Sequence, residues 1–267
     1  VCYCHSPPRY LWEMQDTYLK QSSQLGWLGK MVFKAITPYV REFDRRAAQR
    51  VDHFIANSNF VAERIKRCYG KDSTVIYPPV ANDDFIYSSE KDNFYLVVSE
   101  LVPYKRIDIA VEAFNQNGKR LLIIGSGSEL EYLKSIAQPN IEFLGRAPFD
   151  RLKEAYSKCR AFIFPGIEDF GITPLEAQAS GTPVIAYGEG GALETVIDAE
   201  TGLFFDSQTA DALVDAVDRF EGMQLDPLAC RRQAERFSEP RFRREIKDFL
   251  VKVAPDVLEE YEWPAID

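Results

Sequence analysis

The stretch that decides the fold is AFIFPGIEDFGITPLEAQASGTPVIAYGEGG, residues 161–191. It begins with the apolar run Ala161–Pro165, passes through a loop into the helical segment Pro174–Ala179, and returns to a second apolar run, Thr182–Tyr187. Short apolar runs on either side of a helix are typical of two parallel strands joined by a crossover. The stretch therefore predicts one β-α-β unit of a parallel sheet.

The same alternation extends along the chain in both directions. Further strands are predicted at Val1–Cys4, His53–Ser58, Thr74–Tyr77, Phe94–Ser99, Arg120–Gly125, Ile141–Gly145 and Leu203–Phe205. Helices are predicted at 26–50 (interrupted near Pro38), Asn59–Tyr69, Ile107–Asn115, Ser128–Ala137, Asp150–Cys159, Leu193–Ile197, Thr209–Phe220, Pro227–Phe237 and Arg241–Val253. This order of elements predicts an α/β fold with two Rossmann-like domains built on parallel sheets.

A polar and acidic stretch, Ala81–Asn93, has the composition of a linker between the two domains. We therefore expect residues 1–90 to form the remnant of an N-terminal domain and residues 91–237 to form a C-terminal domain. Residues 238–267 are expected to form a helical segment that crosses back to the N-terminal domain. The first domain is expected to be incomplete, because the chain starts at Val1 inside a strand and without Met.

Composition excludes several classes of protein. A net charge of −9 and a pI near 5.0 argue against nucleic-acid binding, which requires a basic surface. Five scattered cysteines predict no disulfide framework and favour the reducing cytoplasm. Cys2, Cys4 and His5 are the only close group of soft ligands, too few for a zinc site, so no metal is expected. No signal peptide is expected, and the sequence contains no apolar run long enough to span a bilayer.

Ligands of open parallel sheets lie beyond the carboxyl ends of the strands, and of those ends the loop at 165–176 is the richest in candidate site residues. Thr173 is a candidate N-cap, so the backbone N–H groups of Gly171–Thr173 are predicted to point outward and suit a phosphate. Two carboxylates, Glu168 and Glu176, flank this helix start. A capping box from Thr173 to Glu176 is the favoured explanation of Glu176 on pattern alone. Glu168 has no helix to cap, which favours a functional role.

Lys105 and Arg106 form a second cluster between a predicted strand and a predicted helix. Cations are disfavoured at a helix N-terminus, and a bound anion would resolve the conflict. These two residues are therefore candidates for holding the negative charge of a departing diphosphate. The chain contains no Asp-x-Asp sequence that would chelate a metal for such a group.

Glycines follow two other predicted strands. Gly125-Ser126-Gly127 resembles a dinucleotide fingerprint but lacks its third glycine, which makes it weak evidence. Gly190 and Gly191 are explained equally well by close approach to a ligand or by a plain turn. His5 ends the first strand, where a structural role and a place in the site are about equally supported.

These residues together resemble glycosyltransferase family 4, whose two-domain fold is called GT-B. The resemblance covers nearly the whole chain and is close to mannosyltransferase-like members of surface-polysaccharide biosynthesis. The matching phrases are Tyr3–Tyr10, Ile55–Ser58, Tyr77–Val80, Leu101–Asp108 and the loop Glu168–Glu176. It implies a retaining hexosyltransferase that needs no metal or cofactor, with a GDP-sugar as the favoured donor, a UDP-sugar as the second choice, and a glycan or lipid-linked acceptor.

The resemblance also implies roles for individual residues. Glu168 would bind the donor sugar, Lys105 would neutralise the diphosphate, and His5 would approach the sugar from the acceptor-side domain, residues 1–90. Glu176 would bind the ribose hydroxyls. Phe170, Gly171, Ile172 and Thr173 would offer backbone contacts to the sugar and the phosphate. From the residue pattern, the predicted donor contacts also include Arg106, Gly190 and Gly191.

Two departures from the family pattern open an alternative. Glu100 stands where many relatives carry Arg, and relatives have about a hundred further residues before the equivalent of Val1. The chain as given is therefore either an active enzyme or a catalytically silent nucleotide-sugar-binding fragment or subunit.

Residues 10–50 suggest contact with a membrane. Between positions 26 and 50 six basic residues outnumber two acidic ones, and aromatic and aliphatic residues are interspersed among them. Such a segment suits the anionic inner face of a membrane, where lipid-linked acceptors reside. An ordinary helix with a core-facing side is the alternative, and the pattern slightly favours it. Tyr18 of this segment lies outside the residues that the structure describes.

Overall fold

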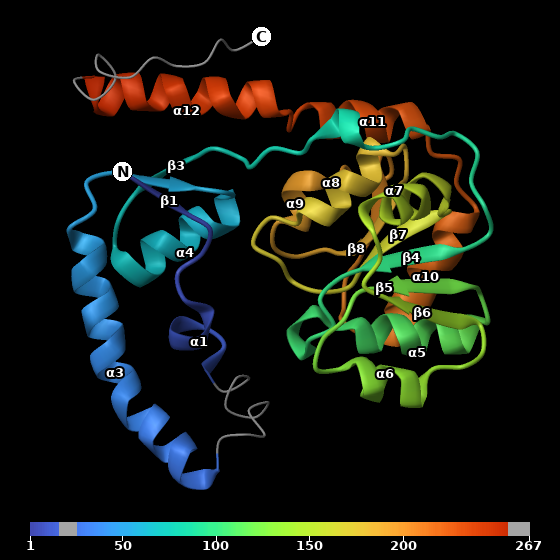
Figure 1. Cartoon of the computed structure of the whole chain (residues 1–267), viewed down its shortest axis with the longest axis horizontal. Coiled ribbons are helices and arrows are strands. Elements are labelled where there is room, and N and C mark those ends of the chain that lie inside the picture. The colour runs from blue at the N-terminus through green and yellow to red at the C-terminus, as the bar shows by residue number, and fades with distance from the viewer. Residues whose placement is uncertain (16–25, 256–267) are drawn as a thin grey trace. The chain divides into compact units, whose positions relative to one another are not determined.

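A computed structural model describes residues 1–15 and 26–255 of the chain. The chain divides into two compact units, which are shown in Figure 1. One contains Val1–Tyr77 together with the part of helix α12 that begins at Arg244. The other contains Pro78–Arg243.

The larger unit is built on a six-stranded parallel sheet with the order β6-β5-β4-β7-β8-β9. Its strands are β4 (Tyr95–Val98), β5 (Leu121–Ile124), β6 (Ile141–Gly145), β7 (Ala161–Phe164), β8 (Val184–Tyr187) and β9 (Gly202–Phe205). The strands β5 and β7 are buried along their whole length, as continuous apolar runs in a sheet covered on both faces require. The predicted alternation of strands and helices is confirmed for this unit.

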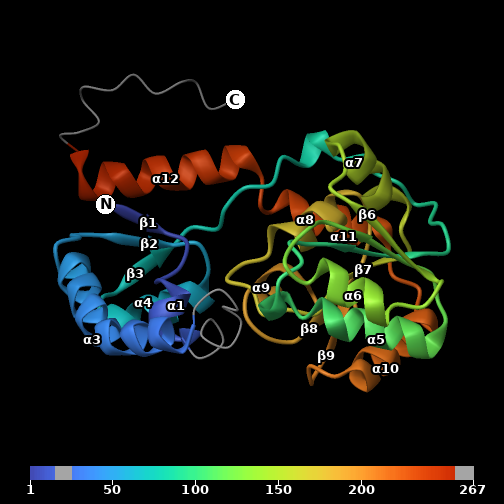
Figure 2. The same cartoon turned by 60° about the horizontal axis from the view of Figure 1, so that its bottom comes forward.

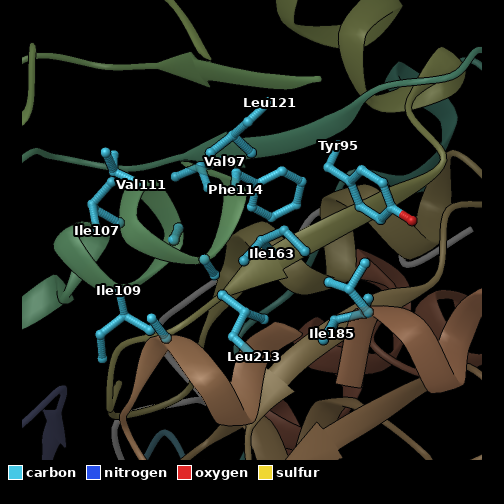
Figure 3. Close-up of a cluster of buried hydrophobic side chains, with 14 of the residues drawn as sticks. Tyr95, Val97, Ile107, Ile109, Val111, Phe114, Leu121, Ile163, Ile185 and Leu213 are labelled. Atoms are coloured by element: carbon cyan, nitrogen blue, oxygen red, sulfur yellow. The ribbon is translucent and has the colours of Figure 1, made fainter. Parts of the chain in front are cut away.

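Helices cover both faces of this sheet (Figures 1 and 2). The helical segments of this unit are η1 (Asn82–Asp84), η2 (Pro103–Lys105), α5 (Ile107–Asn117), α6 (Leu130–Ile136), α7 (Phe149–Lys158), α8 (Ile172–Ala179), α9 (Ala192–Thr195), α10 (Ala210–Glu221) and α11 (Pro227–Glu235). The main core lies between the sheet and helices α5, α6 and α10. Figure 3 shows its centre, where Phe114 of α5 and Leu213 of α10 meet Ile163 of β7.

The smaller unit contains a three-stranded parallel sheet in the order β1-β2-β3. Its elements are β1 (Cys2–Cys4), α1 (Arg9–Trp12), α3 (Trp27–Gln49), β2 (Phe54–Ala56), α4 (Asn59–Tyr69) and β3 (Ser73–Val75). Ser58 caps α4 by accepting a hydrogen bond from the Val61 amide at 3.0 Å, and Gly70 ends the helix with a φ of 68°. The side chain of Arg64 is buried and pairs with Glu13 at 2.6 Å, which fastens the segment after α1 to α4.

Helix α3 runs without a break through Pro38, so the predicted interruption is wrong. Proline removes one backbone donor, but Pro38 lies on an exposed part of the helix, where water can hydrogen-bond the carbonyl that this donor would have served. The neighbouring Thr37 is buried, and its hydroxyl donates to the Phe33 carbonyl at 2.7 Å. Among the described helices, none combines the length and the apolar character that crossing a membrane requires.

The stretch predicted as a linker packs along the larger unit. The Lys91 ammonium group donates to the carbonyls of Ser157 and Ser180 and to the Thr182 hydroxyl, at 2.9, 3.2 and 2.7 Å. Burial lowers the pKa of Lys91 to about 8. Arg231 of α11 donates to the carbonyl of Asn82 at 2.8 Å. These contacts hold the stretch against helices α7, α8 and α11. Helix α12 (Glu239–Val253) then continues from the larger unit into the smaller one.

Candidate functional site

The site lies at the point where the strand order of the larger sheet reverses. Strands β4, β5 and β6 follow one another in one direction, and β7, β8 and β9 follow on the other side of β4. The loops after β4 and β7 therefore leave the sheet in opposite directions, which is where open parallel sheets bind their ligands. These two loops carry Lys105 and Glu168, respectively.

Lys105 and Glu168 form an ion pair between the Nζ and Oε1 atoms. Lys105 ends η2, and Glu168 lies in the loop between β7 and α8. Gly166 allows the two loops to approach, because a Cβ atom there would lie 2.8 Å from the carbonyl oxygen of Lys105. The two side chains are only 21% and 14% exposed. The structure thus brings together the two residues that were predicted to act on the sugar and on the diphosphate.

Arg106 has a left-handed backbone with a φ of 54°, which among the described non-glycine residues is shared only by Ala199. Such conformations cost roughly 1–2 kcal/mol and are concentrated at functional sites. Its guanidinium group pairs with Asp108 in the first turn of α5, at 3.2 Å. Asp108 therefore supplies, at this helix N-terminus, the negative charge that was expected to come from a bound anion. Binding of phosphate by Arg106 stays a prediction.

Helix α8 begins at Ile172, with Gly171 as the N-cap at a φ of 89° and without a side-chain cap. The predicted capping box is therefore wrong, since Thr173 lies inside the first turn. Gly171 occupies the cap because its left-handed backbone would strain any other residue. The N–H groups of the first helical turn have no acceptors within the helix, so those of Ile172 and Thr173 are suited to an anion.

The carboxylate of Glu176 contacts a residue of α7. Its Oε2 atom accepts a hydrogen bond from the Tyr156 hydroxyl at 2.8 Å. Burial raises the pKa of Glu176, and the bond from Tyr156 acts in the opposite direction by favouring the ionised form. Sequence reasoning did not identify Tyr156, because nothing in the pattern of residues 150–159 distinguishes it from an ordinary core tyrosine.

Gly190 and Gly191 have a structural use that neither sequence interpretation anticipated. A Cβ atom at Gly191 would lie 2.2 Å from the Cα atom of Phe170, and one at Gly190 would lie 2.6 Å from the carbonyl oxygen of Glu168. The Gly191 amide donates to that same carbonyl at 2.9 Å. The two glycines therefore let the loop after β8 support the loop that carries Glu168. The ring of Phe170 is buried against Phe237, with centroids 5.7 Å apart.

Gly125 and Gly127 support the other loop of the site. A Cβ atom at Gly125 would lie 1.8 Å from the carbonyl oxygen of Ser99, and one at Gly127 would lie 2.2 Å from that of Leu101. The Leu101 amide donates to the carbonyl of Ser126 at 3.0 Å. These glycines thus act in packing beneath the Lys105 loop. Glu100, on the same loop, is exposed.

His5 lies in the smaller unit at the carboxyl end of β1. It is exposed, and its ring meets that of Tyr3 edge to face with centroids 5.3 Å apart. Its approach to a sugar held by the larger unit stays a prediction.

Comparison with protein families matches both parts of the chain. The model described as glycosyl transferases group 1 matches residues 81–237, and the model described as Glycosyltransferase Family 4 matches residues 1–84. The O-antigen chain mannosyltransferase RfbU of Salmonella typhimurium is 32% identical over 162 residues, which are 55% of this chain and 45% of the relative. The GDP-mannose-dependent alpha-(1-6)-phosphatidylinositol monomannoside mannosyltransferase of Mycobacterium tuberculosis is 29% identical over 226 residues, with 73% and 57% covered. The chain spans about half the length of these relatives.

Solved structures agree on the fold. The sucrose-phosphate synthase of Thermosynechococcus elongatus matches with a TM-score of 0.71 at 22% identity, covering 82% of this chain and 62% of that one. Anabaena Alr3699/HepE, solved in complex with UDP, matches with a TM-score of 0.70 at 19% identity, with 79% and 68% covered. Together with the family model that covers more than half of the chain, these similarities show that the chain belongs to the group 1 glycosyl transferases and has the GT-B fold.

Proposed function

We propose that the chain carries the donor site of a retaining glycosyltransferase, which moves a hexose from a nucleotide diphosphate sugar to a glycan or lipid-linked acceptor. The observation that carries the proposal is the ion pair of Lys105 and Glu168 at the point where the strand order reverses. It places a cation beside a carboxylate where a parallel sheet receives its ligand. The Lys105 ammonium group suits a diphosphate, and the Glu168 carboxylate suits the hydroxyl groups of a sugar.

In the proposed reaction the acceptor hydroxyl bonds to the anomeric carbon on the face from which the diphosphate leaves. The bond between that carbon and the phosphate oxygen breaks with its electrons going to the diphosphate, which also takes the acceptor proton. Lys105, Arg106 and the N–H groups at the start of α8 stabilise the charge of the leaving group. Glu168 stabilises the positive charge that develops on the sugar, and His5 approaches the sugar from the acceptor side. No metal or cofactor is part of this scheme.

We favour mannose as the sugar and GDP as the nucleotide, because the M. tuberculosis relative is named as GDP-mannose-dependent. A UDP-sugar is the second choice, since Alr3699/HepE was solved with UDP. Calorimetric titration with GDP-, UDP- and ADP-sugars, without metal and then with magnesium, tests the choice. Saturable binding without metal is expected for one nucleotide, and a requirement for magnesium would contradict the scheme.

Two variants test the roles of the ion pair. We expect Glu168→Ala and Lys105→Ala each to abolish most sugar transfer in an active enzyme that contains this chain. Arg120→Ala, which removes an exposed ion pair with Glu142 at the start of β5, is the matched control and should leave transfer unchanged. Transfer at near wild-type rates by either variant of the ion pair would remove it from the mechanism.

The alternative function is a catalytically silent nucleotide-sugar-binding fragment or subunit. Glu100 favours it, because an exposed carboxylate on the Lys105 loop opposes the binding of a diphosphate. Hydrolysis or transfer of a bound donor separates the two functions, since a silent module would bind the donor and release it unchanged. In a silent module, Glu100→Arg should tighten donor binding without producing turnover.

We further propose that the protein is cytoplasmic and contacts the inner face of the membrane through α3. Exposed apolar side chains recur at helical spacing on this helix, at Leu28, Val32, Ile36, Tyr39 and Phe43. Their face is opposite the buried Thr37 and Ala48, and the helix carries more basic than acidic residues. Flotation with vesicles that contain anionic lipid tests the proposal.

The flotation experiment has its own matched pair of variants. Val32→Glu with Tyr39→Glu should abolish flotation, because both changes fall on the exposed apolar face. Tyr132→Glu with Leu228→Glu removes exposed apolar side chains from the larger unit and should leave flotation unchanged. Equal binding by both double variants, or none by the unaltered chain, would contradict the membrane contact.

A further inference from the structure

We propose that Tyr156 is a positioning residue for Glu176, holding its carboxylate by Oε2 so that Oε1 accepts a hydrogen bond from a ribose hydroxyl of the bound nucleotide. The inference rests on the proposed function, because it assigns a task to the nucleotide end of that site. It adds a residue that does not touch the ligand itself.

The direction of the Tyr156 hydroxyl is fixed by its surroundings. The side chain belongs to α7 and is fully buried, with its ring against those of Phe85 and Phe162 at centroid distances of 5.9 and 5.6 Å. Its carbonyl oxygen accepts a hydrogen bond from the Thr182 hydroxyl at 2.6 Å. A side chain packed in this way has few alternative rotamers, so its hydroxyl points steadily at Glu176.

Glu176 has one oxygen engaged and one available. The Tyr156 hydroxyl donates to Oε2 at 2.8 Å, while Oε1 has no hydrogen-bond donor in the part of the chain that the structure describes. The residue is partly exposed, so Oε1 can be reached from solvent. A carboxylate oxygen with free lone pairs accepts from hydroxyl groups, and the vicinal hydroxyls of ribose are donors.

The hydrogen-bond donor beside the Glu176 carboxylate is a neutral group, the Tyr156 hydroxyl. Of the helices packed against α8, α11 contributes Arg231, which donates instead to the carbonyls of Asn82 and Ala179 at 2.8 Å each. A cation beside Glu176 would compete for both carboxylate oxygens, as bidentate pairing with arginine does. Tyrosine donates only one hydrogen and so leaves the second oxygen for the ligand. Burial raises the pKa of Glu176, and the Tyr156 bond offsets this effect in favour of the ionised acceptor.

The test compares Tyr156→Phe with a matched control in the same unit. Tyr95 is also buried, and its hydroxyl donates to a carboxylate, Oε1 of Glu221, at 2.6 Å. Tyr95→Phe therefore removes the same kind of bond at a place with no part in the site. Both substitutions keep the aromatic ring and its packing. Thermal unfolding of the two variants, measured without nucleotide, shows whether each is folded.

Binding is measured by calorimetry with UDP, GDP and ADP, and then with the 2′-deoxy and 3′-deoxy forms of the tightest ligand. We expect Tyr156→Phe to weaken the ribonucleotide about tenfold and to leave at least one deoxy form nearly unchanged, so that preference for ribose falls. Tyr95→Phe should change neither. In the background of Glu176→Gln, adding Tyr156→Phe should have no further effect, because the two residues act as one unit.

The outcomes separate this inference from the proposal on which it rests. If the folded wild-type chain binds none of the three nucleotides, the donor site itself is refuted and the inference falls with it. If the wild type binds and Tyr156→Phe binds with unchanged ribose preference, the donor site stands and the positioning role is wrong. Equal weakening of ribose and deoxyribose forms would show that Tyr156 only maintains the fold.

Discussion

Separating the structural from the functional contribution of the Lys105–Glu168 ion pair requires three variants. Lys105→Met and Glu168→Gln each remove one charge while nearly keeping the volume of the side chain, and the double variant removes both. We expect each single variant to be destabilised and the double variant to recover most of the loss. Donor binding should be lost in all three.

The magnitude follows from the burial of the pair. Removing one partner of a deeply buried ion pair costs about 3–5 kcal/mol, because the other charge is left uncompensated. An exposed pair contributes roughly 0–1 kcal/mol. The side chains of Lys105 and Glu168 are 21% and 14% exposed, which lies between these limits and nearer the buried one. We therefore expect each single variant to lose about 1.5–3 kcal/mol in free energy of unfolding and the double variant less than about 1 kcal/mol.

Urea unfolding gives the free energies, and calorimetric titration of the nucleotide sugar gives the binding. The matched pair is Arg120–Glu142 at 3.2 Å, whose side chains are 62% and 50% exposed and lie at the opposite end of the same sheet. Its single variants should change the stability by less than about 1 kcal/mol and leave donor binding unaltered.

Two results would refute the reasoning. Single variants as stable as the wild type would show that the pair is solvated and that its burial has been overestimated. A double variant that still binds and transfers the sugar would show that the charges serve stability alone, and the proposed mechanism would lose both residues.

Three further predictions follow from contacts elsewhere in the chain. Gly191→Ala places a methyl group against the backbone of Phe170 and should cost about 1–3 kcal/mol of stability and weaken donor binding. Gly222→Ala is the control and should do neither, because the nearest atom to its added methyl group lies 3.5 Å away. Equal effects of the two variants in thermal melts and titrations would contradict the packing argument. The pKa of Lys91 is lowered to about 8 in the folded state, so above that pH the unfolded chain binds a proton that the folded chain has lost. The stability of the wild type relative to Lys91→Met should therefore rise by up to about 1.4 kcal/mol per pH unit from pH 8 to 9.5. If the difference in free energy of urea unfolding between the two proteins does not change with pH, a neutral Lys91 is ruled out. Glu13→Gln removes the carboxylate charge that pairs with the buried guanidinium of Arg64 and should cost about 2–4 kcal/mol, measured by urea unfolding, and a loss below about 0.5 kcal/mol would mean that α4 does not depend on this pair.

The strands of the larger unit could be predicted because both faces of the sheet are covered. A strand such as β7 then consists of an unbroken apolar run, and the turn residues on either side mark its ends. Strand order was not predicted, because crossovers of one hand reduce the possible arrangements to a few but do not select one of them. The sequence placed the Lys105 and Glu168 loops at carboxyl ends of strands, and the structure showed that these two loops meet at the reversal.

The helix starts were predicted less well, because capping depends on backbone angles that the sequence pattern does not fix. Thr173 and Ser128 each precede a glutamate by three residues, which is the pattern of a capping box. The structure begins α8 after the left-handed Gly171 and α6 after Glu129, and in neither helix does a side chain cap the first turn. In both cases the loop geometry before the helix decided its first residue.

The residues that contact the site residues could not be predicted from the sequence. The bond between Tyr156 and Glu176 joins residues on two helices, and the glycine contacts under Glu168 join loops from neighbouring strands. Such pairings depend on how the elements pack, and no periodicity within one segment records them. Asp108 beside Arg106 was close enough in sequence to be found, but the argument from the helix dipole looked only for an external anion.

The glycine contacts have a consequence for anyone who exchanges segments between relatives to change donor preference. The loop after β4 fits the chain only because Gly125 and Gly127 leave room for the backbone of Ser99 and Leu101. A chimera that takes only the Lys105 loop from a relative would place that relative's backbone against Gly125 and Gly127, which fit the backbone of the original loop. The two loops should therefore be transplanted together, and so should the loop of Glu168 with that of Gly190 and Gly191, so that the units of exchange are pairs of loops from adjacent strands.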